Sequence, residues 1–299
     1  MSFEELRARL TSGRPLVVDA DTCASFRARG VIVDFPGAVG ELLRKSPRAV
    51  LDHYRAEVES DVNVVCALTA DTTPRALAEV GMQHRAAALT SAAVELAQEA
   101  RTQSKRPIAI AGVLGSEMVA PMFADRLREE LEEHAARIHT AGVELMLARG
   151  QGSRLELMTA VAAAAATDLP VWAILECLQG AELAVGGTLP PLLEALQEAG
   201  ASAVLFEVGS IDDGLAALER VQGLIEAESF AVGVLLAGGP NSVRGFPDEY
   251  SEPQTWAARA LELDTAGARV IGGGAGTTEA HTASLVSALR TIHPTIVPR

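Results

Sequence analysis

The stretch Ile271-Gly-Gly-Gly-Ala-Gly-Thr-Thr-Glu-Ala-His281 joins the end of a short apolar run to a glycine-rich turn and the start of an alanine-rich segment. The apolar run covers 268–272 and lacks the polar alternation of a half-exposed strand. Such a run is typical of a parallel strand buried on both faces. We interpret it as the last strand of a barrel, followed by the loop that covers the active-site mouth.

Seven similar apolar runs precede this stretch, and helical segments lie between them. We expect the earlier strands at 14–21, 61–68, 107–114, 142–147, 170–175, 201–206 and 230–236. The clearest helical periodicity covers 74–100, 122–140, 156–167, 189–199, 211–226 and 252–266. Eight strand and helix alternations predict an α/β fold, a (β/α)8 TIM barrel in which residues 1–299 form a single domain. The stretch 23–60 is expected to hold a loop and one helix.

Composition and net charge indicate the kind of core and the partners that the protein can have. The chain has 299 residues, of which 48% are hydrophobic and only 4% aromatic, so the core must be mostly aliphatic. A formal net charge of −14 argues against nucleic acid and anionic membrane surfaces as partners. Neither a signal peptide nor a membrane-spanning run is apparent. We therefore expect a cytoplasmic protein with a small-molecule substrate, and the composition leaves a homo-oligomer open.

Strand ends select the candidate site residues, because barrel enzymes work at the carboxyl ends of their strands. If the first strand extends far enough, Asp19 and Asp21 point to one face, where they could bind a cation or tune a proton donor. The alternative is that both are loop acids that cap the next segment. Glu176 and Glu207 end two later strands. For Glu207 the alternative to a functional role is a surface ion pair with an arginine.

The glycine loop has two interpretations. Amides around Gly273 and Gly274 could bind an anion at the start of the last helix. Alternatively, the loop is a tight turn with Thr277 or Thr278 as the helix N-cap, which the pattern alone favours. His281 is a candidate general acid or base, although packing or capping is the more common role of such a histidine.

Cysteine chemistry offers little support for a reactive site. The three cysteines are Cys23, Cys66 and Cys177, too sparse for a disulfide framework. Cys177 ends the fifth predicted strand. It has no basic neighbour in sequence, which favours a buried, inert thiol over a reactive thiolate.

Several of these motifs resemble the homocysteine S-methyltransferase family, zinc-dependent (β/α)8 barrels that transfer methyl groups to homocysteine. Val17-Val-Asp-Ala-Asp21 is similar to the opening strand of the family, and Ala111-Gly-Val-Leu-Gly115 to a later block. Pro240-Asn-Ser242 matches a family block directly. The most specific resemblance is Ala266–His281, which is similar to the glycine loop that carries paired cysteines in the family.

The departures from the family pattern concern its zinc site. The resemblance implies three zinc cysteines, and this chain has Val208, Gly274 and Ala275 in their places. It also implies a glutamate near the amine of the substrate, and here that position reads Ala148, followed by Arg149. A thiol without zinc, with a pKa of about 8.5, is only a few per cent ionised at neutral pH. We therefore predict no metal and no cofactor, and an anionic ligand in preference to an amine.

Three hypotheses follow from the resemblance. In the first, the protein is an enzyme that acts on a small methylated sulfur or nitrogen compound. Its catalytic residues would be Asp19, Glu207 and His281, and its substrate-binding residues Asp21, Arg149, Glu176, Asn241, Gly273 and Gly274. In the second, the protein is a true homocysteine methyltransferase with another metal set, for example Asp19, Glu207 and His281, which is disfavoured because oxygen-rich ligands suit Mg²⁺ or Mn²⁺ better than zinc. In the third, the protein is a non-catalytic binding or regulatory relative.

Overall fold

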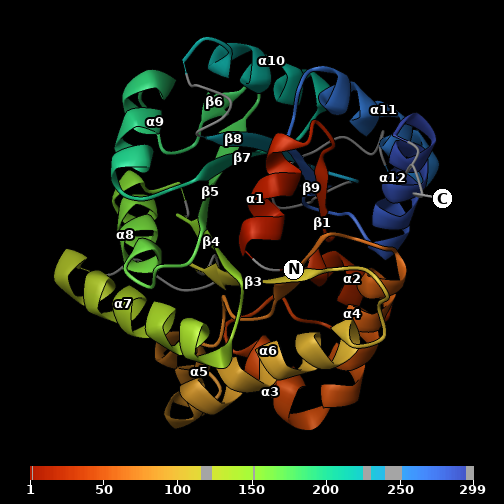
Figure 1. Ribbon diagram of the computed structural model, residues 1–299. Helices are drawn as coiled ribbons and strands as arrows, with labels where there is room; N and C mark the ends of the chain where they lie inside the picture. Colours follow the sequence, from red (N-terminus) through yellow and green to blue (C-terminus); the bar gives the residue numbers. More distant parts are fainter. Residues whose placement is uncertain (2, 116–122, 151, 225–229, 240–250, 294–299) are drawn as a thin grey trace.

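Eight parallel strands form a closed barrel in the computed structural model, which describes residues 1–299 except 2, 116–122, 151, 225–229, 240–250 and 294–299. Neighbours follow the order β4, β3, β2, β1, β9, β8, β7, β5, and the β4–β5 pairing closes the circle (Figure 1). The strands are β1 (Leu16–Val18), β2 (Val64–Ala67), β3 (Ala109–Leu114), β4 (Leu145–Arg149), β5 (Val171–Leu178), β7 (Ala203–Val208), β8 (Ala231–Leu236) and β9 (Val270–Gly273). The predicted (β/α)8 barrel is therefore confirmed.

Helices surround the barrel on the outside (Figure 1). They are α1 (Phe3–Thr11), α2 (Thr22–Ala28), α3 (Ala38–Lys45), α4 (Pro47–Glu59), α5 (Pro74–Ala78), the 3-10 turn η1 (Gln83–Arg85), α6 (Ala86–Arg101), α7 (Ala124–Ala141), α8 (Arg154–Ala165), α9 (Leu189–Glu198), α10 (Ile211–Val221), α11 (Pro253–Thr265) and α12 (Glu279–Ile292). The exception is α1, which lies across one end of the barrel.

The pleat of each strand sorts its side chains into two cores. Inward positions such as Val64, Trp172 and Leu205 fill the barrel, while alternate residues such as Val65 and Phe206 pack against the helices. Burial on both faces explains why the strands appear in the sequence as continuous apolar runs. Leu6 of α1 is 2% exposed and belongs to the inner core, so α1 closes the amino-terminal end of the barrel. The mouth therefore opens at the other end.

Two stretches contain more helices than the sequence predicts. Residues 23–60 form parts of three helices, α2, α3 and α4, instead of one. Gly37 has a φ of +83° at the N-cap of α3, and Pro47 begins α4, so these two residues divide the stretch into short helices. The segment 74–100 is also divided, because Gly81 has a φ of +68° between α5 and η1.

A two-residue strand, β6 (Glu182–Leu183), was not predicted. It pairs antiparallel with the end of β5, where Cys177 lies opposite Leu183, so β5 extends to Leu178 and carries a hairpin. Asp213 of α10 accepts hydrogen bonds from the amides of Gly180 and Ala181 at 2.8 and 3.1 Å and holds the hairpin turn. The first strand is shorter than predicted and ends at Val18.

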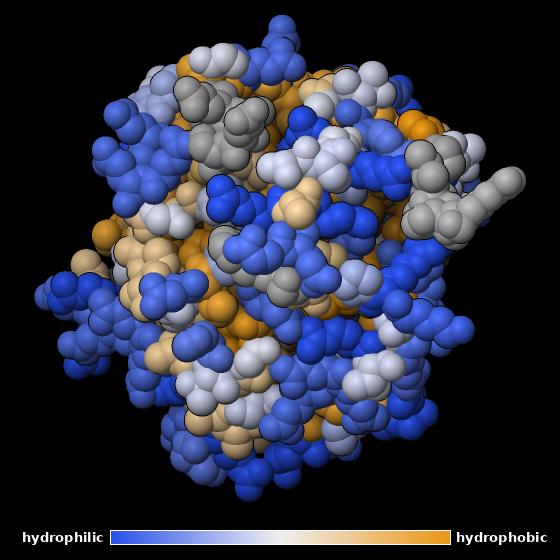
Figure 2. All heavy atoms as spheres, viewed as in Figure 1, coloured by the Kyte–Doolittle hydropathy of each residue, from blue (hydrophilic) through white to orange (hydrophobic). Residues whose placement is uncertain are grey.

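The face that carries α1 is mostly hydrophilic, with apolar residues visible between the helices (Figure 2). Within the described part of the chain, no helix combines the length and the apolar character needed to cross a membrane.

Candidate functional site

Three charged residues reach the mouth from neighbouring strands. Arg149 ends β4, Glu176 lies near the end of β5, and Glu207 lies in β7. All three share the inward parity of the inner-core residues on their strands. Glu176 lies directly opposite Glu207 in the β5–β7 register, and the guanidinium of Arg149 forms an ion pair with the carboxylate of Glu207. The mouth therefore holds two carboxylates and a guanidinium at its β4, β5 and β7 side.

The Arg149–Glu207 pair is largely removed from solvent. The Glu207 side chain is 8% exposed and the Arg149 side chain 26%. A buried carboxylate is costly without a charged, hydrogen-bonded partner, and the guanidinium supplies one. The sequence left a surface ion pair as the alternative for Glu207. The ion pair is present, but it lies inside the barrel.

The orientation of β4 corrects one expectation from the resemblance. Ala148 is fully buried and packs in the outer core, against the helices. Arg149, one residue later, points into the barrel. Of these two β4 residues, the one that faces the mouth is therefore the arginine.

Asp19 follows directly after β1 and is 2% exposed. Its carboxylate accepts a hydrogen bond of 2.7 Å from the amide of Cys66 in β2, and its own amide donates to Val64. Burial raises the pKa of the Asp19 carboxyl to about 7, although the bond from Cys66 acts in the opposite direction. An acid with this pKa exchanges its proton near neutral pH.

Asp21 would share a strand face with Asp19 only if β1 extended that far, but β1 ends at Val18, and for Asp21 the structure shows the capping role that the sequence left as the alternative. Asp21 is instead the N-cap of α2 and accepts a hydrogen bond of 2.9 Å from the amide of Cys23. Its other carboxylate oxygen accepts one of 3.0 Å from the amide of Gly276. Asp21 thus ties the first loop of the mouth to the last, and burial raises the pKa of its carboxyl.

The amides of the glycine loop bond within the protein. Gly273 donates to the carbonyl of Asp19 at 3.3 Å and Gly274 to that of Leu236 at 2.8 Å. The amide of Gly276 is held by Asp21. This arrangement matches the tight-turn interpretation, and the amides that an anion would need already have partners.

His281 is 4% exposed in the first turn of α12. Its Nδ1 accepts a hydrogen bond of 3.1 Å from the amide of Thr278, in a capping box with Thr278 as N-cap. The imidazole also contacts the indole of Trp256 edge to face, with ring centroids 5.5 Å apart. The structure therefore places His281 in the capping and packing role that the sequence left as an alternative.

The model of one protein family, homocysteine S-methyltransferase, matches residues 16–289. That match covers every strand of the barrel and both loops that Asp21 joins. The chain belongs to this family. Its resemblance to the family, predicted from the glycine loop and the strand motifs, is confirmed.

Solved structures agree at the level of the fold. The homocysteine methyltransferase MmuM from Escherichia coli, in its metallated form, is 21% identical, with a TM-score of 0.79 over 95% of this chain and 99% of that one. Its oxidised form is 20% identical, with the same TM-score and coverage. A 3-dehydroquinate dehydratase from Geobacillus kaustophilus is more distant, at 13% identity and a TM-score of 0.53 over 94% of this chain and 93% of that one. No curated protein matches the chain.

Metal ligands do not gather in the part of the family barrel that the structure describes. Among these residues, no group of three His, Cys, Asp or Glu side chains could hold a metal ion. Asp19, Glu207 and His281, the alternative metal set, are therefore not brought together. Val208 is fully buried and packs in the outer core, and Ala275 is also buried.

Two residues of the site were not singled out in the sequence as functional. Cys66 packs against the inner core beside Asp19, and burial together with the Asp19 charge raises the pKa of its thiol. Glu57 of α4 is fully buried behind the first loop. A carboxylate on the mostly apolar buried face of α4, near the end of the helix, was the available signal for Glu57. Asn241, a predicted substrate-binding residue, lies outside the described residues.

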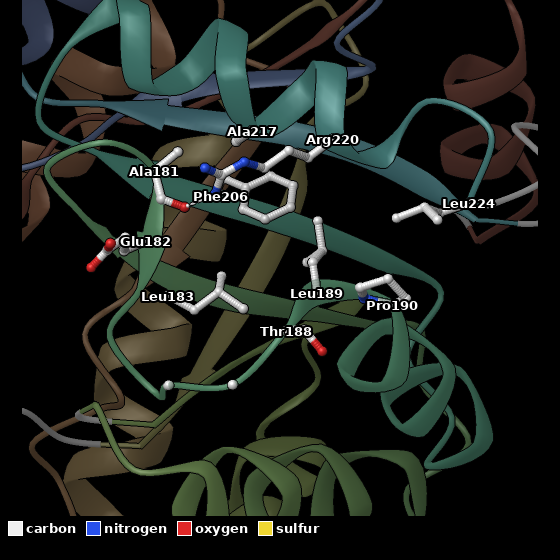
Figure 3. A pocket seen from close by; sticks show the side chains of 12 residues that line it. Ala181, Glu182, Leu183, Thr188, Leu189, Pro190, Phe206, Ala217, Arg220 and Leu224 are labelled. Carbon is white, nitrogen blue, oxygen red and sulfur yellow. Dashed lines mark hydrogen bonds between the residues drawn. The ribbon is translucent and has the colours of Figure 1, made fainter.

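A cavity of about 570 Å³ lies outside the barrel, against the β5–β6 hairpin and the helices α9 and α10 (Figure 3). Leu183, Leu189 and Phe206 form much of its apolar wall. The guanidinium of Arg220 lies along one side and donates hydrogen bonds to the carbonyls of Ala181 and Gly180, at 2.6 and 3.1 Å. The lining of this cavity does not include Arg149, Glu176 or Glu207 of the mouth.

Proposed function

We propose that this member of the homocysteine S-methyltransferase family is an enzyme that acts on a small methylated sulfur or nitrogen compound, without a zinc site of three cysteines. The observation that carries the proposal is the Arg149–Glu207 ion pair, preformed at the mouth of a barrel of this family. A pair of opposite charges suits a substrate that carries both an onium cation and a carboxylate.

The proposed roles follow from the chemistry of each group. Glu207 and Glu176 attract the cationic sulfur or nitrogen, and the planar guanidinium of Arg149 suits the carboxylate. In methyl transfer the acceptor lone pair forms the new bond to carbon, and the electrons of the broken bond stay on the donor. The acceptor then loses its proton, and Asp19 is the group that takes it. For His281 we propose the capping role instead of a catalytic one.

The residues at the implied zinc positions do not fit the metal. Val208, Gly274 and Ala275 offer no donor side chain. A Cβ atom added at Gly274 would lie 2.9 Å from the carbonyl carbon of Leu236 and 3.0 Å from the amide nitrogen of Ala237. A cysteine at this position therefore requires the backbone to move. These observations support a zinc-free site, so the proposed step uses only the carboxylates and the guanidinium.

Metal analysis and a thermal-shift screen test the proposal together. We expect no stoichiometric zinc in the purified protein. We expect S-methylmethionine or a betaine to raise the melting temperature of the wild type and of the control Glu182→Gln, an exposed carboxylate outside the mouth, but not of Glu207→Gln. Stoichiometric zinc would refute the zinc-free site. A ligand response that Glu207→Gln leaves intact would refute the role of Glu207.

A non-catalytic binding relative is the second candidate. The observation that favours it is the glycine loop, whose amides bond to Asp19, Leu236 and Asp21. This candidate predicts no response to any onium compound, homocysteine or small carboxylate, together with binding to a protein partner. A methyl-transfer product detected by mass spectrometry after incubation with donor and acceptor would exclude it.

A further inference from the structure

Glu57 of α4 lies behind the mouth, where the first and last loops of the barrel meet. It is fully buried. Its Oε1 accepts a hydrogen bond of 3.3 Å from the amide of Ala20, the residue after Asp19. Its Oε2 lies 3.2 Å from the hydroxyl of Thr282 in α12. One side chain from outside the barrel therefore joins the loop that carries Asp19 to the helix that follows the glycine loop.

The charged groups around Glu57 are mainly acidic. Asp19 faces it from the end of β1 and Glu279 from α12, and the thiol of Cys66 faces it from β2. Arg29, the C-cap residue of α2, pairs with Glu279 at 2.6 Å, and the charge of Arg149 acts on the thiol of Cys66. On its own helix, His53 is neutral, because burial lowers the pKa of its imidazole to about 3. Within the described part of the chain, Glu57 thus has no cationic partner.

Two buried carboxylates without a cation cannot both carry a charge at reasonable cost. Asp19 is the better place for the single charge, because the amide of Cys66 donates to it at 2.7 Å. The bond of Glu57 to the amide of Ala20 is longer. Burial, and then the charge on Asp19, raise the pKa of the Glu57 carboxyl well above its usual range.

The hydroxyl of Thr282 supports the same assignment. It has one hydrogen and two oxygen neighbours, the carbonyl of Thr278 at 3.4 Å and Oε2 of Glu57 at 3.2 Å. If Glu57 carries a proton, its O–H donates to Thr282 and the hydroxyl of Thr282 donates to Thr278. Both contacts are then hydrogen bonds, which a charged Glu57 does not allow at the same time.

We propose that Glu57 is a positioning residue that keeps its proton at neutral pH and, as a neutral acid, ties Ala20 to Thr282, so that Asp19 is the carboxyl of the pair that ionises. The inference rests on the proposed role of Asp19 in the mouth. A neutral acid at this point fixes the first loop against α12 without adding a second negative charge beside Asp19.

NMR of isotopically labelled carboxyl carbons tests the protonation directly in the wild-type protein. Through-bond assignment identifies the two resonances, and their loss in Glu57→Gln and Asp19→Asn checks it. We expect the Glu57 resonance to stay at its protonated position between about pH 5 and pH 8, while Asp19 titrates near neutral pH. A Glu57 carboxyl that is ionised at neutral pH would overturn the inference.

Variants test the positioning role. Gln is a neutral isostere, so Glu57→Gln should leave the Asp19 midpoint within about 0.5 pH units of the wild type, as should Glu59→Gln, an exposed control on the same helix. Glu57→Ala removes the tie and admits water, and we expect the Asp19 midpoint to fall by about 1 pH unit or more. A similar fall in Glu57→Gln would show that Glu57 is charged in the wild type. An unchanged midpoint in Glu57→Ala would show that Glu57 does not act on Asp19.

These measurements need no substrate, so they separate the inference from the proposed function. If Glu57 is protonated and no onium compound binds, the proposed function fails and the carboxyl pair stands. If onium compounds bind through Glu207 and Glu57 is ionised, the inference fails and the proposed function stands.

Discussion

On the side of the mouth formed by β1, β9 and α12, polar groups bond to one another across the loops, as in the pairs of Asp21 with Gly276 and of Glu57 with Ala20. On the side formed by β4, β5 and β7, charged side chains point into the barrel, and Arg149 holds Glu207 there. The first side uses its hydrogen-bonding groups to fix the backbone. The second places charged side chains inside the mouth.

The two sides of the mouth therefore differ in what they reveal: one carries the family likeness, and the other carries the charged groups. The glycine loop on the first side carries the strongest family likeness, yet its backbone is packed so closely that Gly274 has no room for a side chain. The charged side carries the groups that can recognise a small ion. Variants on the two sides should therefore lose stability for different physical reasons.

The largest effect is expected on the charged side. Arg149→Gln removes the guanidinium that pairs with the buried Glu207 carboxylate and should lower the free energy of unfolding by about 3–4 kcal/mol. Adding Glu207→Gln should recover a large part of that loss, because the double variant buries neither charge of the pair. Urea denaturation of the two single variants and the double variant measures the coupling. Strictly additive single effects would show that the pair does not contribute as a unit.

A smaller loss is expected on the closed side. Gly274→Cys restores a cysteine that the resemblance implies, but its Cβ meets the backbone of Leu236 and Ala237, so we expect a loss of about 2–3 kcal/mol. Ala275→Cys is the matched control, since that residue already has a Cβ, and it should cost less than about 1 kcal/mol. Metal analysis of both variants should find no stoichiometric zinc. A Gly274→Cys protein that is as stable as the wild type would contradict the close packing of this loop.

Much of the barrel could be predicted from the sequence, because strands buried on both faces leave apolar runs that stand out from amphipathic helices. The helices within 23–60 could not be recognised in the same way. Gly37 and Pro47 divide the stretch into pieces too short to show a clear period. The hairpin at β6 consists of two residues, fewer than any periodic pattern needs.

The candidate site was predictable in position but not in orientation. Strand ends located Glu176 and Glu207, yet a shift of one residue decides whether Ala148 or Arg149 faces the mouth. β1 ends at Val18, before both Asp19 and Asp21, so the two acids do not share a strand face, and the sequence does not mark this boundary. Glu57 comes from a helix behind the barrel, and only packing brings it to Ala20.

The smallest effect concerns the pH dependence of the closed side. The pKa of Asp19 is raised to about 7 in the folded protein, whereas an unfolded chain has an ordinary carboxyl. The folded state therefore binds more protons between these two pKa values, so the contribution of Asp19 is present at low pH and is lost as the pH rises towards 7. In Asp19→Asn this loss is absent. The stability of the variant relative to the wild type should then rise by about 2 kcal/mol between about pH 5 and pH 8.

Urea denaturation of both proteins across this pH range measures the difference in their free energies of unfolding. His53 and His134 titrate in both proteins, so their contribution cancels in this difference. Burial lowers the pKa values of these histidines to about 3 and about 4, so their linkage has the opposite sign and would mask Asp19 in the wild type alone. Asp52→Asn, an exposed carboxylate on α4, is the control and should follow the wild type. Parallel curves for Asp19→Asn and the wild type would mean that Asp19 titrates as an ordinary acid. In that case a group that exchanges a proton near neutral pH would have to lie on the charged side of the mouth. The hydrogen-bonded side would then only fix the backbone.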